Sequence, residues 1–528
     1  MSKDTLKVSG VKYSTAEDGY FEKRKLKRSA GIWGLWGLAI AAVISGDFSG
    51  WNFGIGFAGF GGMLIAFVVV VVMYYALIYS VGEMAAAMPH TGGAYSFARS
   101  AMGPWGGYIT GVAETIEYVA TTAVIVFFSA SYADSIAATL FNVELADGAH
   151  VLPMWLWYVI LYAVFIIINW VGASLSFKFS IWVSFISIAI LVVFFAMTLF
   201  TGSFSWDKLW DIPADSGAST FLPHGILPIL FAVPFAMWFF LGIEELPLAA
   251  EESHNPAKDI PKAGRTALLT LVIFAVLVLF LNTGVNGSAS TGAAGEPLLD
   301  GFRAILGESG AQLAAVLSLF ALIGLLASLQ GIMFAYGRNM YSLSRAGYYP
   351  KFFSLTGKRQ TPWVSLLIGA VIGFVALVVV DYLVSLDPEG AGATGGAIVL
   401  NIAVWGAVIS YLMQMVSFII LRRRFKNANR PYRSPWGVPG AVIAAIISVL
   451  IFVGFLLNPA FTPAIIAVAV VYVVLLLGFA IFGRNRLILS PEEEYALSGG
   501  QHGDPAKEGY GGAVEAEILA HDGVDGQK

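Results

Sequence analysis

Twelve long apolar stretches are spread along this chain, and they constrain its fold more than any other feature. A helix needs about 20 apolar residues to cross the hydrocarbon core of a membrane. The sequence reaches this length at residues 32–56, 61–87, 104–135, 153–172, 179–201, 224–248, 264–286, 311–337, 363–385, 397–421, 438–457 and 460–482. We therefore predict an all-α polytopic membrane protein with twelve transmembrane helices, with ten spans and two re-entrant segments as the alternative.

The composition excludes several classes of protein. Hydrophobic residues make up 58% of the 528 residues and charged residues 12%, against about 25% charged in an average soluble chain. A soluble enzyme is therefore excluded. With 0 cysteines and 6 histidines, no metal site and no cofactor are expected. The chain has no phosphate-binding GxxxxGK[ST] loop, and its net charge of −4 does not indicate a nucleic-acid partner.

The lysines and arginines predict the orientation in the membrane, because cytoplasmic segments are enriched in them. With the N-terminus inside and twelve crossings, all of the 30 Lys and Arg except Lys208 and Arg303 fall on or near the inner side. This predicts a multi-pass protein of the plasma membrane (the cell inner membrane) with both termini cytoplasmic. Residues 1–30 are expected to form a polar tail and residues 487–528 a disordered acidic tail.

Two of the spans contain residues that interrupt helices. Residues 44–54 (ISGDFSGWNFG) lie in the first span, and residues 238–247 (WFFLGIEELP) lie in the sixth. Glycine, serine, aspartate and asparagine form helices poorly, and proline removes a backbone donor. Interrupted helices at matching positions of two halves are typical of the binding site of an inverted-repeat transporter. Simple kinks held by neighbouring helices are the alternative.

Several stretches together resemble the amino acid–polyamine–organocation superfamily of secondary transporters. They are residues 83–95 (EMAAAMPHTGGAY), Glu117 with Tyr118, residues 240–244 (FLGIE) with 251–256 (EESHNP) and 260–261 (IP), and residues 337–350 (GRNMYSLSRAGYYP). The resemblance extends over nearly the whole chain between the two tails.

This resemblance implies the leucine-transporter-like fold, in which five helices are followed by five inverted ones. Repeat one would occupy about 31–201 and repeat two about 224–422. Two extra helices at 438–482 would complete a transporter domain of residues 31–486, with helices 1 and 6 discontinuous.

Asp47 is the residue from which we predict the chemical class of the substrate. Residues 46–52 (GDFSGWN) resemble the helix 1 signature of the ethanolamine permease group. In the amino acid transporters of the superfamily, the glycine-rich break of helix 1 is expected to hold the substrate carboxylate on backbone N–H groups. A carboxylate at position 47 would repel that group and attract an ammonium. As an alternative or additional role, Asp47 would cap the second half of helix 1.

The sixth span contributes four candidate substrate-binding residues. Glu244 corresponds to the superfamily's helix 6 glutamate, which the resemblance links to gating. Glu245 is an intramembrane acid, a functional residue by default unless it faces water. Trp238 matches an aromatic residue that covers the substrate and would attract an ammonium by a cation–π interaction, with plain packing as the alternative. Gly242 marks the break itself.

Other candidates lie in the first and third spans. Ser45, Gly46 and Ser49 border Asp47, and the two hydroxyls could contact a substrate hydroxyl. Glu114 and Glu117 lie three residues apart, on one face of a helix, where they could share a proton and act in gating or coupling.

We therefore predict a secondary transporter that imports a small primary amine, ethanolamine first of all, by alternating access. An amino acid permease of the same superfamily and a non-transporting sensor on this fold are the alternatives. The coupling ion, H⁺ or Na⁺, stays open, because span 179–201 lacks the lysine that several proton-coupled relatives carry in helix 5.

Overall fold

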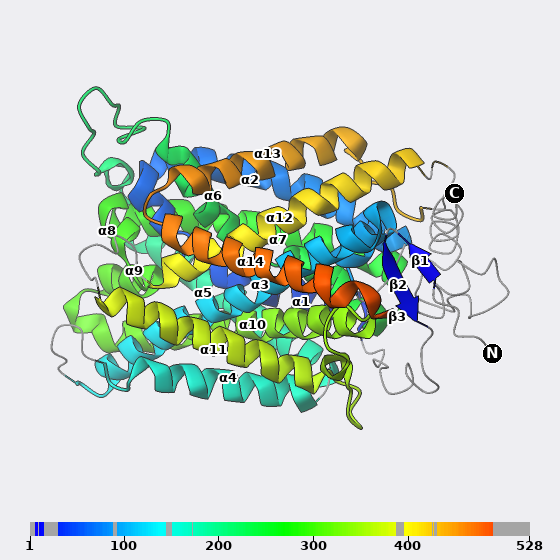
Figure 1. Ribbon diagram of the computed structural model, residues 1–528. Helices are drawn as coiled ribbons and strands as arrows, with labels where there is room; N and C mark the ends of the chain where they lie inside the picture. Colours follow the sequence, from blue (N-terminus) through cyan, green and yellow to red (C-terminus); the bar gives the residue numbers. More distant parts are fainter. Residues whose placement is uncertain are drawn as a thin grey trace.

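A computed structural model describes residues 6–8, 10–14, 30–87, 92–143, 150–171, 173–386, 395–424, 426 and 430–488. Most of the predicted tails, and residues 88–91 of the stretch 83–95, lie outside these described residues. The described chain is a bundle of long helices that run side by side (Figure 1).

Helices make up nearly all of the bundle, as predicted. The α-helices are α1 Ile32–Val43, α2 Phe53–Ala87, α3 Ala94–Leu140, α4 Met154–Val171, α5 Ala173–Thr201, α6 Pro228–Trp238, α7 Pro256–Asn286, α8 Ser288–Ala293, α9 Pro297–Leu306, α10 Ala311–Arg345, α11 Trp363–Leu386, α12 Gly395–Arg424, α13 Gly437–Leu457 and α14 Thr462–Ile481. Short 3₁₀ helices are η2 Ile44–Asp47, η3 Asp207–Trp210, η4 Ile243–Glu252, η5 Glu308–Gly310, η6 Lys351–Ser354 and η7 Gly483–Asn485.

The predicted spans all correspond to apolar helices. Among the described residues, 11 helices are long and apolar enough to cross a membrane, and Ile32–Asp47 forms a shorter apolar helix. The first predicted span continues through α1 and η2 into the start of α2, where Gly59 (φ 70°) separates it from the second span. The sixth comprises α6 and η4. Both predicted breaks are therefore confirmed.

The described ends of the chain meet in a small sheet that the sequence did not predict. Strand β1 (Leu6–Val8) pairs antiparallel with β2 (Val11–Ser14), and β2 pairs in parallel with β3 (Leu487–Ile488). Leu487 and Ile488 are buried, so the expectation of a solvated tail from residue 487 is wrong for these two residues. β2 and β3 therefore lie at the same end of the bundle (Figure 1).

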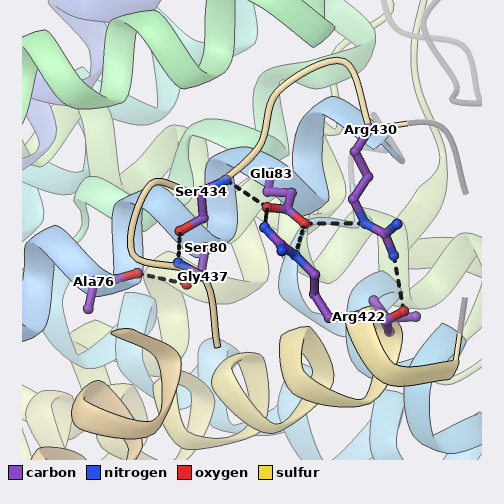
Figure 2. Close-up of polar contacts among 8 residues, drawn as sticks. Ala76, Ser80, Glu83, Arg422, Arg430, Ser434 and Gly437 are labelled. Atoms are coloured by element: carbon purple, nitrogen blue, oxygen red, sulfur yellow. Dashed lines mark hydrogen bonds and ion pairs between the residues drawn. The ribbon is translucent and has the colours of Figure 1, made fainter. Parts of the chain in front are cut away.

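A buried carboxylate fixes α2 to the connection between α12 and α13. Figure 2 shows Glu83, in the last turns of α2, facing two arginines. Arg422 donates to it from Nε and Nη2, both at 2.6 Å, and Arg430 Nε lies 3.2 Å away. The backbone N–H of Ser434 adds a bond of 2.6 Å. A carboxylate with several charge-assisted donors is fully compensated, so Glu83 anchors the two additional helices to the repeats.

Candidate functional site

The two broken helices meet at their breaks. A Cβ built on Gly46 would lie 2.5 Å from the carbonyl oxygen of Trp238 and 2.9 Å from Cα of Phe239. The indole Nε1 of Trp238 donates to the carbonyl oxygen of Ser49 at 2.9 Å. Only glycine permits this close backbone approach, so the predicted residues Gly46, Ser49 and Trp238 come together as one junction.

Positive φ angles explain why both helices stop. Gly50 has φ +93° and Gly242 has φ +101°, a region that residues with a Cβ rarely adopt. The N–H of Gly242 donates to Glu244 Oε2 at 3.2 Å, which replaces a lost helical bond with one to a side chain. The backbone therefore changes direction at Gly50 and Gly242 because no larger residue fits these angles.

Asp47 lies in η2, within the break of helix 1, and is 1% exposed. Neither of its carboxylate oxygens has a hydrogen-bond partner among the described residues. The N-cap alternative required a bond from this carboxylate to a backbone N–H, so the structure does not support that role. A buried charged group normally needs a partner, and the absence of one here is typical of a ligand site.

Other polar groups of the first break are hydrogen-bonded within the protein. The N–H of Ser45 donates to Ser328 Oγ of α10 at 2.8 Å. The N–H of Gly50 donates to Asn52 Oδ1 at 3.1 Å, and the hydroxyl of Tyr132 donates to the carbonyl oxygen of Phe48 at 2.8 Å. At least two of the N–H groups that could hold a substrate carboxylate are therefore occupied.

Glu244 belongs to a second polar cluster, which joins η4 to α2, α3 and α12. The hydroxyl of Tyr411 lies 2.7 Å from Glu244 Oε2 and 3.2 Å from Glu117 Oε1. Glu244 is also the strongest electrostatic neighbour of the Glu117 carboxyl. Tyr74 completes the cluster, with its hydroxyl 3.2 Å from that of Tyr411 and 3.4 Å from the carbonyl oxygen of Met237.

Glu114 is hydrogen-bonded by side chains of its own helix and of α10. It accepts from Asn339 Nδ2 at 3.0 Å and from the Tyr118 hydroxyl at 3.4 Å. The sharing of a proton between Glu114 and Glu117 stays a prediction, and Glu244 acts more strongly on the Glu117 carboxyl than Glu114 does. Sequence spacing along one helix did not reveal this neighbour from another element.

Glu245 is 1% exposed, and both of its oxygens lack a partner among the described residues. The alternative in which it faces water does not hold. Its electrostatic neighbours are Glu244 and Arg338 of α10. Arg338 is already engaged by Glu252 at the end of η4, through Nε at 3.3 Å and Nη2 at 2.9 Å.

The end of the bundle that carries the sheet is closed by backbone bonds. The N–H of Ala30 donates to the carbonyl oxygen of Glu252 at 2.9 Å, and the N–H of His254 donates to that of Ala30 at 2.8 Å. The start of helix 1 is therefore tied to the segment after η4, whose Glu252 is in turn held by Arg338.

The opposite end is covered by residues 287–297, which we call the lid segment and which contain α8 (Figure 1). Ser49 Oγ donates to the carbonyl oxygen of Gly295 at 3.0 Å. Asn52 Nδ2 donates to those of Thr291 and Ala294, both at 2.8 Å. Ser49 and Asn52 therefore hold the lid segment over the first break, and the site is closed at both ends.

Sequence reasoning found the two breaks but missed several of their partners. Tyr74, Tyr132 and Tyr411 lie in apolar spans, and no local pattern distinguishes them from packing residues. The lid segment lies between two predicted spans, and its GSASTGAAG run at 287–295 contains small residues that permit close backbone contact.

Comparison with known proteins gives the family. The model of the amino acid permease family matches residues 34–488. An uncharacterized transporter of Rhizobium meliloti is 27% identical over 335 residues, which cover 63% of this chain and 68% of that protein. An L-asparagine permease of Streptomyces coelicolor is 24% identical over 451 residues, covering 82% of this chain and 87% of that protein.

Among solved structures, a variant of the manganese transporter of Eremococcus coleocola has the same fold. Its TM-score is 0.50 at 14% identity, and the match covers 87% of this chain and 96% of that one. The predicted leucine-transporter-like fold, with two inverted repeats and discontinuous helices 1 and 6, is confirmed. Because the family match extends over residues 34–488, this chain belongs to the amino acid permease family and is a multi-pass membrane transporter.

Proposed function

We propose that the protein is a permease of the plasma membrane that imports a small primary amine, with ethanolamine as the first candidate, by alternating access. The sheet end of the bundle would face the cytoplasm, together with both termini. One observation carries the proposal: Asp47 is buried in the break of helix 1 with both carboxylate oxygens unpartnered.

A negative charge on Asp47 would favour the binding of an amine over that of an amino acid. Two unit charges about 4 Å apart at an effective dielectric constant near 20 interact by roughly 4 kcal/mol. Asp47 would attract an ammonium by this gross amount, before desolvation is subtracted, and would repel a carboxylate to a similar degree. The engagement of the Ser45 and Gly50 N–H groups within the chain further weakens a carboxylate site.

The residues around Asp47 receive complementary roles in this proposal. Trp238 would cover the ammonium with its ring, a cation–π contact of roughly 0.5–2 kcal/mol. Ser45 and Ser49 would supply contacts for the substrate hydroxyl, since a hydroxyl that donates to Gly295 still has lone pairs to accept with. Gly46 and Gly242 would let the backbone approach the substrate, and Glu244 and Glu245 would keep the surroundings negative.

An amino acid permease is the second candidate. It is favoured by the family itself and by the relative named for L-asparagine. Uptake of labelled ethanolamine in the presence of excess neutral amino acids separates the two. If Asp47 selects against zwitterions, the amino acids compete weakly; strong competition would support the amino acid permease.

A sensor that binds without transporting is the third candidate. Thermal unfolding of the purified protein is measured with ethanolamine, other small amines and amino acids, because a ligand of the folded state raises the midpoint. The same protein in proteoliposomes is then tested for uptake. Stabilisation by amines together with uptake supports the permease, whereas stabilisation without uptake supports a sensor.

A further inference from the structure

Three positively charged side chains at the sheet end of the bundle have no acidic partner among the residues that the structure describes. Lys262 and Arg265 lie near the start of α7, and Arg433 lies in the connection between α12 and α13. All three are exposed. Arg265 donates from Nε to the carbonyl oxygen of Pro261 at 3.1 Å, and its two Nη groups have no acceptor in the described chain. These Nη groups belong to the planar fork that matches a phosphate.

Aromatic residues from two distant segments accompany these cations. The guanidinium carbon of Arg265 lies 5.1 Å from the ring centre of Tyr432. Tyr79 of α2 is an electrostatic neighbour of Tyr432 and packs edge-on against Trp436, with ring centres 5.6 Å apart. Tyrosine and tryptophan are typical of the level at which lipid headgroups meet water. We define the Arg265 patch as Lys262, Arg265 and Arg433 together with Tyr79, Tyr432 and Trp436.

The buried carboxylate of Glu83 holds half of this patch in place. Arg430 Nε lies 3.2 Å from it, and the N–H of Ser434 donates to it at 2.6 Å (Figure 2). Tyr432 and Arg433 lie between these two anchors in the sequence, so their backbone is fixed at the end of α2. Little conformational freedom is then left to lose when a ligand binds.

The acidic residues near the patch leave it positive. Glu83 is compensated by Arg422 and Arg430. Asp259 is the only acidic residue of α7, and its Oδ2 accepts from the N–H of Asn255 at 3.3 Å. The connection at 430–437 contains no acidic residue. The patch therefore attracts an anion.

An apolar stripe continues from Arg265 along α7. Leu269, Ile273 and Leu277 follow at intervals of four residues, on one face of the helix, and are 53%, 49% and 37% exposed. This face is suited to contact with lipid chains. A ligand with an anionic head and an apolar tail would use both the cations and the stripe, whereas a soluble anion would use the cations alone.

We propose that the Arg265 patch binds the headgroup of an anionic phospholipid, with an acyl chain along the apolar stripe of α7. In the orientation proposed above, this lipid belongs to the cytoplasmic leaflet. Arg265 holds the headgroup phosphate with its Nη groups. Lys262 and Arg433 favour a headgroup with a net negative charge over a zwitterionic one. The site does not depend on the identity of the transported substrate.

Lipid titrations of the purified full-length protein in detergent test this proposal. The thermal unfolding midpoint is followed as phosphatidylglycerol is added, because a ligand of the folded state raises it. We expect the midpoint to rise with phosphatidylglycerol, but not with phosphatidylcholine of the same acyl chains or with inorganic phosphate. An equal rise with phosphatidylcholine would show that net charge is not recognised. An equal rise with inorganic phosphate would show an ion site without a lipid. Either result would overturn the proposal.

Two double variants locate the lipid, with a control because cytoplasmic segments are generally rich in lysine and arginine. Arg265→Gln with Arg433→Gln should raise the apparent dissociation constant for phosphatidylglycerol roughly 30-fold, about fivefold for each cation. Lys358→Gln with Arg359→Gln removes two other exposed cations, in the connection between η6 and α11, and should bind like the wild type. Equal losses in the two double variants would indicate a general attraction to anionic lipids and overturn the assignment to the patch.

A single variant keeps the test decisive if the first double variant does not fold. Arg433 is exposed and makes no hydrogen bond to the described residues, so Arg433→Gln should fold normally. We expect its dissociation constant for phosphatidylglycerol to rise about fivefold. Native mass spectrometry, which counts the lipids retained by each protein molecule, measures this constant without unfolding. An unchanged constant in Arg433→Gln would contradict the proposed site.

Discussion

The indole Nε1 of Trp238 lies 2.9 Å from the carbonyl oxygen of Ser49 and donates a hydrogen bond to it. This bond joins the end of α6 to the break of helix 1, at a point where Gly46 brings the two backbones together. The substrate site that we propose is built around this junction, so changes there should affect stability and binding together.

Gly46→Ala should disrupt the junction. The added Cβ would lie 2.5 Å from the Trp238 carbonyl oxygen, and backbone cannot move aside as a flexible side chain can. Overpacking of this kind costs about 1–3 kcal/mol. We expect a lower unfolding temperature and loss of amine-induced stabilisation. Gly478→Ala in α14, where a Cβ meets nothing within 4 Å, is the control and should match the wild type. Full binding by Gly46→Ala would contradict the close approach of the two breaks.

Asn52→Ala should loosen the lid segment. It removes both bonds from Nδ2 to the carbonyl oxygens of Thr291 and Ala294, each worth about 1 kcal/mol. The chain contains 0 cysteines, so Thr291→Cys, at a position of the lid segment that is 0% exposed, gives a single labelling site that is protected while the segment is closed.

The measurement is the rate at which a membrane-impermeant maleimide labels this cysteine from outside. We expect Asn52→Ala to raise the rate about 30-fold, because about 2 kcal/mol of closing free energy is lost. Thr270→Ala, on an exposed side of α7, should not change it. Equal rates in Asn52→Ala and the parent would mean that Asn52 does not hold the lid segment closed.

Arg338 and Glu252 should behave as a coupled pair. Removing one partner of a buried ion pair leaves an uncompensated charge and costs about 3–5 kcal/mol. Glu252→Gln and Arg338→Met should therefore each lower thermal stability strongly. The double variant should lose much less than the sum of the two, since neither charge of the pair is then left without the other. Additive losses in this double-mutant cycle would show that the contact carries little coupling.

Glu296, at the end of the lid segment, should make stability depend on pH. Burial raises the pKa of its carboxyl, although a bond from Ser131 opposes this. When the pKa of an acid is higher in the folded than in the unfolded protein, ionisation of that acid costs more in the folded state. The folded protein therefore loses stability as the pH rises from the unfolded pKa through the folded pKa. We expect Glu296→Gln to be more stable than the wild type at pH 8 and nearly equal at pH 4. Thermal unfolding at both pH values checks this, and a wild type that is the more stable at pH 8 would contradict it.

The sequence was sufficient for the fold and for the two breaks, and the physical reason is the membrane. Backbone polar groups in hydrocarbon must bond within helices, so helix-breaking residues such as Gly46 and Gly242 stand out where they interrupt apolar spans. Acidic side chains are also costly within a membrane, so Asp47, Glu244 and Glu245 stand out in the same spans.

Contacts between helices could not be predicted in this way. Only spacing along one helix can be read from a sequence, which places Glu117 beside Glu114, whereas Tyr411, whose hydroxyl lies near both Glu117 and Glu244, comes from another helix. The use of Ser49 and Asn52 to hold the lid segment depends on the folding of residues 287–297, which no periodicity indicated. The terminal sheet pairs residues more than 470 positions apart, so no local sequence pattern could predict it either.

The affinity for ethanolamine of the wild type and of Asp47→Asn tests the central claim most directly. Asparagine keeps the size of the side chain but removes its charge, so the gross attraction of roughly 4 kcal/mol is lost and part of the desolvation cost is recovered. We predict a dissociation constant raised at least about tenfold, equal to about 1.4 kcal/mol, with no such change for Gly478→Ala. An unchanged dissociation constant in Asp47→Asn would contradict the account.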